Sequence, residues 1–324
     1  MSKRRINKQQ SARIEKIQQS YHDTKDNLHD SLADGLVITR FSRHVELEDK
    51  DGKRVRCSIR PNLDILVAGD RVIWQTEGDN QGVVVSLYPR ASILARPTAA
   101  GLQKPIAANI TQLIIVIAPK PELSWPLLDS YLIMAETLRL HAVILMNKSD
   151  LPSQRIKQEL IGDYQPLGYP LIFTSQTHMA GYEELKKVLN HQVSVFVGQS
   201  GVGKSSLIAG ILPHEPNIQI QDISEISELG RHTTSNSRYY HLPSGGALID
   251  SPGIREFSLW SMDMPSLAQA YPEFAPLIPQ CKYRNCLHVN TPHCAILEAL
   301  KHGKLSKRRY DNFIKLSMQF KKES

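Results

Sequence analysis

The segment GQSGVGKS at residues 198–205 constrains the fold of this chain more than any other feature. It follows the apolar strand pattern VSVFV, precedes the helical pattern SSLIAGIL, and fits GxxxxGK[ST]. In such a loop the glycines let backbone N–H groups converge on phosphate oxygens, and the positive end of the following helix points at the same place. A Gly-rich turn with a surface lysine is the alternative. The strand and helix flanks favour an α/β domain that binds a nucleotide.

The residues of this loop have separate expected roles. Lys204 would contact the β and γ phosphates, and Ser205 would ligate Mg²⁺. The complete set of candidates for phosphate contact is Gly198, Gln199, Ser200, Gly201, Val202, Gly203, Lys204, Ser205 and Ser206.

A second signature, NKSD, lies upstream at residues 147–150 and closes the apolar run AVILM. The carboxyl end of a parallel strand is where ligands bind in an α/β sheet. Asp150 would accept hydrogen bonds from the N1–H and the amine of guanine, which adenine does not offer, so the bound nucleotides would be GTP and GDP. Asn147 would hold the purine edge, Lys148 would cover the base and Ser149 completes the motif. TSQT at 174–177 follows the next strand and would offer backbone donors near Ser175 to guanine O6.

Two further segments are candidates for magnesium and γ-phosphate contacts. DSPG at 250–253 ends the strand pattern GALI, so Asp250 would hold Mg²⁺ through water and the Gly253 N–H would contact the γ phosphate. GRHTTS at 230–235 is the candidate first switch, in which Thr233 or Thr234 would complete the coordination of Mg²⁺. A polar loop between strands is the alternative interpretation of GRHTTS.

The order of these motifs is unusual. An ordinary GTPase begins with the phosphate loop and ends with the base-reading motif, whereas here NKSD and TSQT precede the phosphate loop, the threonines and DSPG. Side-chain packing does not depend on chain order, and nearby termini permit permutation. The order predicts a circularly permuted GTPase domain with a doubly wound parallel sheet, over 98–258.

Before this domain the hydrophobic pattern is that of short strands. Five β-like runs separated by turn residues occupy 34–97, namely GLVITRF, HVELED, KRVRCSIR, DRVIWQT and GVVVSLY. They predict a small all-β barrel. An OB-type barrel, which commonly binds oligonucleotides or structured RNA, fits the number of strands, and an SH3-like barrel fits nearly as well.

The charge of +7 is concentrated at the two ends of the chain. Residues 1–33 form a polar tail that we expect to be flexible. Basic clusters attract polyanions such as nucleic acid, although solvated tails explain them equally well. The basic residues in question are Lys3, Arg4, Arg5, Lys8, Arg13, Lys16 and Lys25 at one end, and Lys301, Lys304, Lys307, Arg308, Arg309, Lys315, Lys321 and Lys322 at the other.

A candidate metal site lies in the last part of the chain, 259–324, which also contains a basic helix. Cys281, Cys286, His288 and Cys294 give the spacing C-x4-C-x-H-x5-C, which suits tetrahedral Zn²⁺. Four protein ligands leave no position for water, so the site would hold one structural zinc ion. His293 is a possible competitor of His288, and unligated cysteines are the remaining alternative.

The motifs together carry a family resemblance that covers nearly the whole chain. The sequence resembles the bacterial GTPases that depend on the small ribosomal subunit, on the segments KPIAANITQ, DSYL, NKSD, GQSGVGKSS, GRHTTS, IDSPGIREF and the cysteine cluster. The resemblance implies a multi-domain chain with an OB barrel, a permuted GTPase domain and an α-helical zinc domain. It also implies late maturation of the 30S subunit, with GTP hydrolysis that is slow alone and stimulated by that subunit.

The residue that activates water is not obvious. Many GTPases have glutamine directly after DxxG, but this chain has Ile254, which cannot orient water. His232 is the natural candidate, because a neutral imidazole can accept a hydrogen bond from water, and the resemblance points to the same residue. Arg231 could instead neutralise charge in the transition state.

The expected partners and location follow from the same features. We expect a monomer that binds the 30S subunit and 16S rRNA in the cytoplasm and not a membrane, since the apolar runs are too short to cross one and no hydrophobic segment follows the basic N-terminus. An RNA-binding scaffold with a structural nucleotide is the alternative function. A GTPase of DNA metabolism or membrane traffic is a third.

Overall fold

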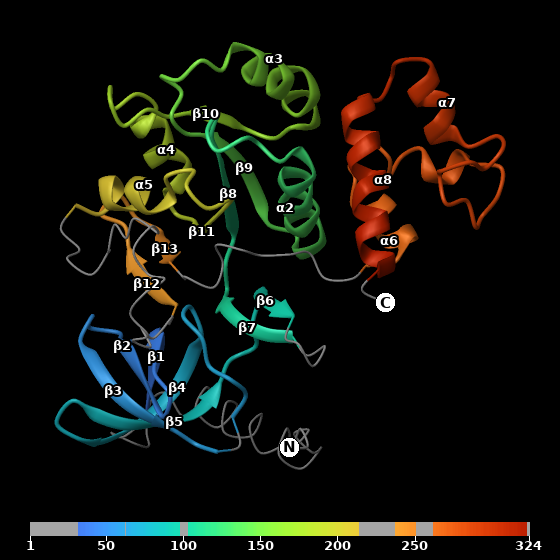
Figure 1. The fold of residues 1–324 in the computed structure, drawn as a ribbon. Helices are drawn as coiled ribbons and strands as arrows, with labels where there is room; N and C mark the ends of the chain where they lie inside the picture. The colour runs from blue at the N-terminus through green and yellow to red at the C-terminus, as the bar shows by residue number, and fades with distance from the viewer. Residues whose placement is uncertain (1–31, 62, 98–102, 214–236, 251–261, 323–324) are drawn as a thin grey trace. The chain divides into compact units, whose positions relative to one another are not determined.

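The computed structural model describes residues 32–61, 63–97, 103–213, 237–250 and 262–322 (Figure 1). These residues form two compact units. Within the described residues, unit 1 contains the chain up to Ile110 together with 237–241 and 247–250. Unit 2 contains 111–213, 242–246 and 262–322.

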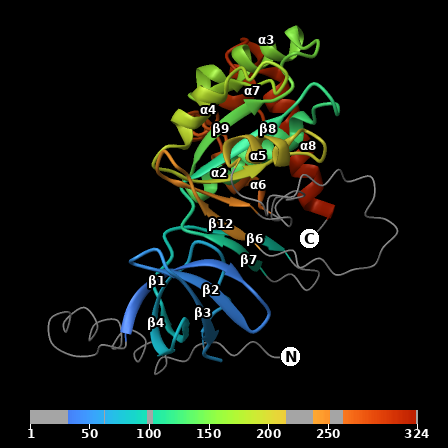
Figure 2. The same ribbon diagram turned by 90° about the vertical axis from the view of Figure 1, so that its left-hand side faces the viewer.

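Unit 1 begins with a five-stranded barrel, seen from two sides in Figures 1 and 2. Its strands are β1 (Leu32–Arg40), β2 (His44–Asp49), β3 (Arg54–Ile59), β4 (Arg71–Gly78) and β5 (Gln81–Leu87). The barrel closes because β1 pairs with both β2 and β4. Strand β5 lies between β3 and β4 and pairs in parallel with β3. This crossed order, in place of a simple meander, is that of an OB-type barrel and decides between the two predicted barrel types.

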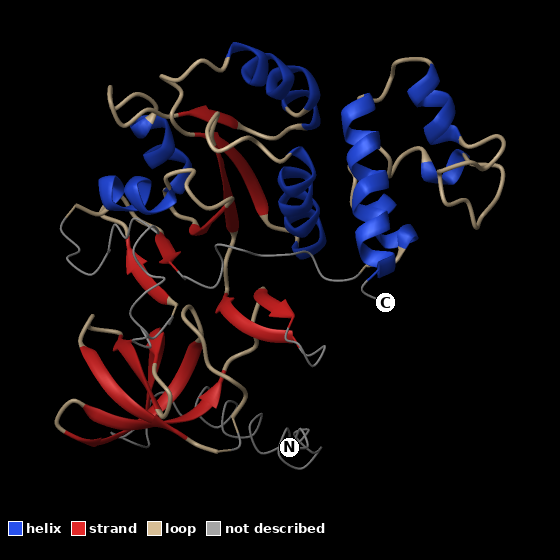
Figure 3. Cartoon of the chain, in the orientation of Figure 1, coloured by secondary structure: helices blue, strands red, loops and turns tan. Residues whose placement is uncertain are grey.

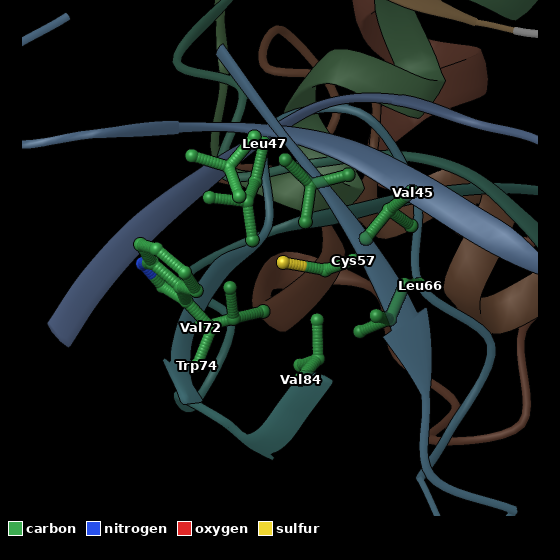
Figure 4. Close-up of a cluster of buried hydrophobic side chains, with 9 residues drawn as sticks. Val45, Leu47, Cys57, Leu66, Val72, Trp74 and Val84 are labelled. Carbon is green, nitrogen blue, oxygen red and sulfur yellow. The ribbon is translucent and has the colours of Figure 1, made fainter. Parts of the chain in front are cut away.

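The interior of the barrel follows from the alternation of apolar and polar residues along its strands. Strand β3 buries Val55 and Cys57 and exposes Arg54, Arg56 and Ser58. Period-two alternation places the apolar residues on one face, toward the core. Figure 4 shows part of the resulting cluster, whose members are Val37, Val45, Leu47, Val55, Cys57, Leu66, Val72, Trp74 and Val84.

Two strand pairs complete unit 1. Strands β6 (Ile93–Pro97) and β7 (Gln103–Ala108) form an antiparallel pair that the sequence did not predict. Strands β12 (Arg238–His241) and β13 (Ala247–Asp250) form another antiparallel pair, and β12 also pairs with β1. The predicted strand GALID is β13, whereas β12 was not predicted.

Unit 2 contains a sheet of parallel strands. Strands β8 (Gln112–Ile117), β9 (His141–Met146), β10 (Leu171–Phe173) and β11 (Val193–Val197) lie in the order β10-β9-β8-β11, and each pairs in parallel with its neighbour. Every residue of β8 is buried, as expected of a strand that is covered on both faces. The predicted parallel α/β domain is confirmed.

Helices connect these strands. They are α2 (Trp125–Leu138), α3 (Gln154–Asp163), α4 (Tyr182–Leu189) and α5 (Lys204–Ile211), with a 3-10 turn, η1, at Gln165–Leu167. Ser124 caps α2 by accepting a hydrogen bond from the N–H of Leu127, and Pro126 occupies the first turn, where its missing N–H is not needed. The positions of α2, α4 and α5 agree with the sequence-based predictions, whereas α3 was not predicted.

The last part of unit 2, residues 262–322, is here called the metal module. It contains α6 (Met264–Gln269), the 3-10 turn η4 (Ile278–Gln280), α7 (Ala295–Lys301) and α8 (Lys307–Lys322). Figure 3 shows helices and loops in this module and no strand among its described residues. Helix α8 runs alongside α2, as Figure 1 shows. Among the described helices of the whole chain, none has the length and apolar character needed to cross a bilayer.

The predicted architecture of a β-barrel, a permuted α/β domain and a helical C-terminal part is confirmed. The boundaries that separate a tail (1–33), a barrel (34–97), a GTPase domain (98–258) and a zinc domain (259–324) stay a prediction.

Candidate nucleotide and metal sites

The phosphate loop leaves the end of β11 and enters α5. Gly198 has a φ of 142° and Gly203 a φ of 96°, values that residues with a Cβ rarely adopt. A Cβ on Gly203 would also collide with the side-chain amide of Asn147. Glycine is therefore required here both by backbone conformation and by the close approach of the base-reading motif.

Lys204 is buried at the start of α5 and lies across the loop. Its ammonium donates hydrogen bonds to the carbonyl oxygens of Gly198 at 2.6 Å and Gln199 at 2.5 Å. The positive charge is thus held at the N-terminus of a helix, where backbone N–H groups and the helix dipole already favour an anion. This is the arrangement that a polyphosphate group needs.

The base-reading motif contacts the phosphate loop directly. The buried amide of Asn147 donates to the carbonyl of Val202 at 2.9 Å, and its oxygen accepts from the hydroxyl of Thr174 at 3.1 Å. The amine of Lys148 donates to the carbonyl of Gly201 at 2.7 Å. Two segments separated in the sequence, in the reverse of the ordinary order, therefore form one site.

Asp150, the last residue of NKSD, is exposed. The hydroxyl of Ser175 donates to its carboxylate at 2.6 Å. This hydrogen bond, with smaller contributions from nearby His178 and Lys148, lowers the pKa of Asp150, so the carboxylate is ionised at neutral pH. The N–H of Ser175 donates to the carbonyl of Ala180, so Ser175 contributes its hydroxyl rather than its backbone N–H.

The remaining nucleotide candidates belong to other parts of the chain. Asp250 is the last residue of β13 in unit 1. Gly253, Arg231, His232, Thr233 and Thr234 lie outside the described residues. Their roles with Mg²⁺, the γ phosphate and water stay predictions.

The four metal-ligand candidates come together in the metal module. The ligand atoms of Cys281, Cys286, His288 and Cys294 all lie within 4.8 Å of one another. Nδ1 of His288 lies 3.6 Å from Sγ of Cys281 and 3.5 Å from Sγ of Cys294, and those two sulfur atoms are 3.9 Å apart. A tetrahedral zinc ion with Zn–S of about 2.3 Å and Zn–N of about 2.0 Å would give S···N near 3.5 Å and S···S near 3.8 Å. The cluster is compatible with zinc.

The choice between the two histidines follows from burial. His288 is 3% exposed and lies inside the cluster, whereas His293 is exposed. Helix α8 braces this segment, because the hydroxyl of Tyr310 donates to the carbonyl of His288 at 2.9 Å.

Two of the C-terminal basic residues are not available to a polyanion. Arg309 is buried between Asp129 and Glu273, and Arg308 pairs with Glu159 and Asp163. Counting them with the exposed basic cluster was wrong, because each neutralises carboxylates within unit 2. The exposed cations of the module include Lys282, Arg284, Lys301, Lys304, Lys307 and Lys315.

Sequence reasoning missed two features of unit 2. The side chain of Gln199 turns away from the phosphate loop toward residues 122–124. Asp129 pairs with Arg309 in the metal module. An acidic residue in the otherwise apolar segment PLLDSYLIM was the one local signal that Asp129 has a buried partner.

Comparison with known proteins agrees with this geometry. A sequence model of the RsgA GTPase family matches residues 87–260, more than half of the chain. A small ribosomal subunit biogenesis GTPase RsgA 1 of Vibrio vulnificus is 43% identical over 318 residues, which cover 96% of this chain and 90% of that protein. The chain belongs to the RsgA GTPase family. It is accordingly a GTPase.

A second curated relative and two solved structures match most of the chain. A small ribosomal subunit biogenesis GTPase RsgA of Haemophilus influenzae is 42% identical over 332 residues, or 98% of this chain and 95% of that protein. The crystal structure of YjeQ from Thermotoga maritima matches with a TM-score of 0.73 and 31% identity, over 89% of this chain and 98% of that one. YloQ, described as a circularly permuted GTPase, matches with a TM-score of 0.71 and 26% identity, over 92% and 98%. The predicted circular permutation is confirmed.

Proposed function

We propose that this GTPase acts in the late maturation of the small ribosomal subunit in the cytoplasm, where it binds 16S rRNA and hydrolyses GTP when the subunit stimulates it. The observation that carries the proposal is the contact of Asn147 and Lys148 with the phosphate loop, which makes one guanine-nucleotide site from both motifs. The names of the relatives supply the connection with the small ribosomal subunit.

In the proposed site each residue of this chain has one task. The carboxylate of Asp150 selects guanine, Lys204 and the N–H groups of the loop bind the phosphates, and Ser205 helps to hold Mg²⁺ together with Asp250 and one of Thr233 or Thr234. Bound Mg²⁺ would neutralise charge on the phosphates. His232 orients the attacking water. We assign this step to His232 because Ile254, the residue directly after DSPG, is apolar and cannot orient water.

The RNA-binding surface is proposed on the barrel and the metal module. Strand β3 exposes Arg54 and Arg56, and the β1–β2 loop carries exposed Arg43. In OB-type barrels, strands 2 and 3 and this loop commonly bind nucleic acid. The metal module adds the exposed cations named above, and one structural zinc ion would fix the loops that carry Lys282 and Arg284.

The proposal is tested by measuring multiple-turnover GTP hydrolysis by the purified monomer with and without purified 30S subunits. We expect strong stimulation by 30S subunits, little by 50S subunits, and none with Lys204→Ala. Hydrolysis that 30S subunits do not stimulate, together with tight binding to them, would favour an RNA-binding scaffold. Preference for duplex DNA over 30S subunits at matched salt would contradict the proposal.

A further inference from the structure

Gln199 lies in the phosphate loop, yet its side chain bonds to a different segment. Its amide nitrogen donates to the carbonyl of Glu122 at 3.3 Å, and its amide oxygen accepts from the N–H of Ser124 at 3.3 Å. Ser124 is the N-cap of α2. Gln199 therefore links the phosphate loop to the first turn of α2.

The segment before α2 has other contacts with the nucleotide site. The amine of Lys148 donates to the carbonyl of Lys120 at 3.0 Å as well as to that of Gly201 at 2.7 Å. Pro121 also borders Gly201, since a Cβ built on this glycine would lie 3.6 Å from Cδ of Pro121. The start of α2 and the phosphate loop thus form one contact zone.

The first turn of α2 also contacts the metal module. The guanidinium of Arg308 lies over the ring of Trp125, 3.9 Å from its centre, and Trp125 is the residue next to Ser124. On the same helix α8, Arg309 pairs with Asp129 of α2, and Tyr310 bonds to the carbonyl of the metal-ligand candidate His288. Three consecutive residues of α8 thus join the metal cluster to α2.

These contacts form a short continuous series. It runs from His288 through Tyr310 and Arg308 to Trp125, and from the adjacent Ser124 to Gln199. Packed interiors have low compressibility, and a helix moves as a unit, so a displacement of α8 reaches the N-cap of α2. Gln199 is the hydrogen-bonding side chain through which that displacement reaches the phosphate loop.

We propose that Gln199 is a positioning residue for the GTPase reaction. Through Gln199, the affinity of the phosphate loop for nucleotide depends on the contact between Arg308 and Trp125. The inference rests on the proposed placement of the nucleotide at this loop. It gives the metal module, which is proposed to contact rRNA, a physical means of changing nucleotide affinity.

The test is a double-mutant cycle on Gln199 and Arg308. Gln199→Met keeps the length of the side chain and removes both hydrogen bonds. Arg308→Lys keeps the charge that faces Glu159 and Asp163 and removes the planar group that stacks on Trp125. The measured quantity is the dissociation rate of a fluorescent GDP from full-length, zinc-loaded protein.

We expect Arg308→Lys to change the GDP dissociation rate about threefold or more in the wild-type background, and to have no further effect in the Gln199→Met background. Residues of one network couple by such amounts, whereas independent sites add. An equal effect of Arg308→Lys in both backgrounds, or no effect in the wild type, would overturn the proposal. If Arg308→Lys lowers the urea midpoint of unfolding, Trp125→Leu removes the other half of the contact and the same cycle is repeated.

Two controls separate this inference from the proposed function. Lys204→Ala should greatly accelerate release of GDP, and if it does not, the nucleotide is not at the phosphate loop and the proposed site fails. If Lys204→Ala strongly accelerates release of GDP but the effects of Gln199→Met and Arg308→Lys are additive, the proposed nucleotide site remains supported. Only the role of Gln199 is then refuted. Lys186→Gln, which breaks an exposed ion pair with Glu183 in α4, should leave the dissociation rate unchanged.

Discussion

Asp129 of α2 and Arg309 of α8 form an ion pair that is closed to solvent, with Oδ1 of the carboxylate 2.6 Å from the guanidinium and exposed fractions of 0% and 1%. The hydroxyl of Tyr164 and the amide of Asn312 also donate to Asp129, and Glu273 accepts two further bonds from Arg309. Burial alone would lower the pKa of Arg309, but Asp129 and Glu273 outweigh it and raise that pKa, so the arginine stays charged. This network fixes the metal module to the GTPase sheet domain.

Arg309→Met should therefore destabilise unit 2. It leaves the buried carboxylate of Asp129 and the half-buried carboxylate of Glu273 without their cation, and breaking a buried pair in this way costs about 3–5 kcal/mol. Urea unfolding measures the loss. The matched control is Lys307→Gln on the same helix, whose pair with Asp311 is exposed and should be worth about 1 kcal/mol or less. Similar losses for the two variants would mean that the buried network does not stabilise the fold.

Asp150→Asn should change which base is bound. The amide presents a donor where guanine also presents donors. GTP affinity should therefore fall about 100-fold or more, because a site built to hydrogen-bond a ligand binds poorly when that pairing is lost. Xanthosine triphosphate has a carbonyl at the position of the guanine amine and should bind more tightly than GTP to this variant. Competition with fluorescent GDP measures both affinities. If GTP and ATP bound equally well to the unmodified protein, Asp150 would not be the base-reading residue.

Gly203→Ala should weaken nucleotide binding with little loss of overall structure outside the loop. The new Cβ would meet the amide of Asn147 and would sit on a residue with φ of 96°. We expect nucleotide affinity to fall more than about tenfold, because holding one residue in an unfavourable backbone conformation costs free energy of that order. Gly162→Ala is the control, since this glycine is exposed in α3 and its Cβ would meet nothing within 4 Å. Equal nucleotide affinity of the two variants would contradict the close contact of Asn147 with the loop.

His288→Ala and His293→Ala should separate the two histidines near the cysteines. We expect one zinc ion per chain in the unmodified protein and in His293→Ala, because His293 is exposed. His288→Ala should lose zinc affinity and, through Tyr310, increase hydrogen exchange at the start of α8. Zinc release on titration with a thiol reagent and hydrogen exchange measure the two effects. If His293→Ala loses zinc and His288→Ala does not, His293 is the zinc ligand and His288 is not.

His232→Ala should lower hydrolysis stimulated by 30S subunits by about 100-fold, the usual contribution of a general base, with little change in GTP affinity. Arg231→Ala is measured alongside, since a larger loss there would assign the step to neutralisation of charge. Turnover and nucleotide affinity are determined on the same preparations. Equal losses of turnover and affinity in His232→Ala would refute a role in hydrolysis.

The strands and helices that carry the motifs were predictable because their signals are local. Period-two alternation in β3 and the continuous apolar run of β8 each occupy about six residues of chain. The pair β6–β7 was missed because Pro97 and Pro105 lie within it, and proline is unfavourable in strands. The type of barrel was undecided in the sequence, because the parallel pairing of β3 with β5 joins strands that are not consecutive.

The features of the candidate sites also fall into two groups, those with a local sequence signal and those without one. The phosphate loop, NKSD and the Cys/His spacing are short patterns whose residue types are dictated by their ligands, so the sequence by itself determined the guanine nucleotide, the set of three cysteines and one histidine suited to zinc, and the permuted order. The direction of the Gln199 side chain and the pairing of Asp129 with Arg309 depend on contacts 75 to 180 residues apart in the chain. Only the tertiary structure decided them, because a side-chain charge or amide takes whichever partner packing brings within hydrogen-bonding distance, and no local pattern records that partner.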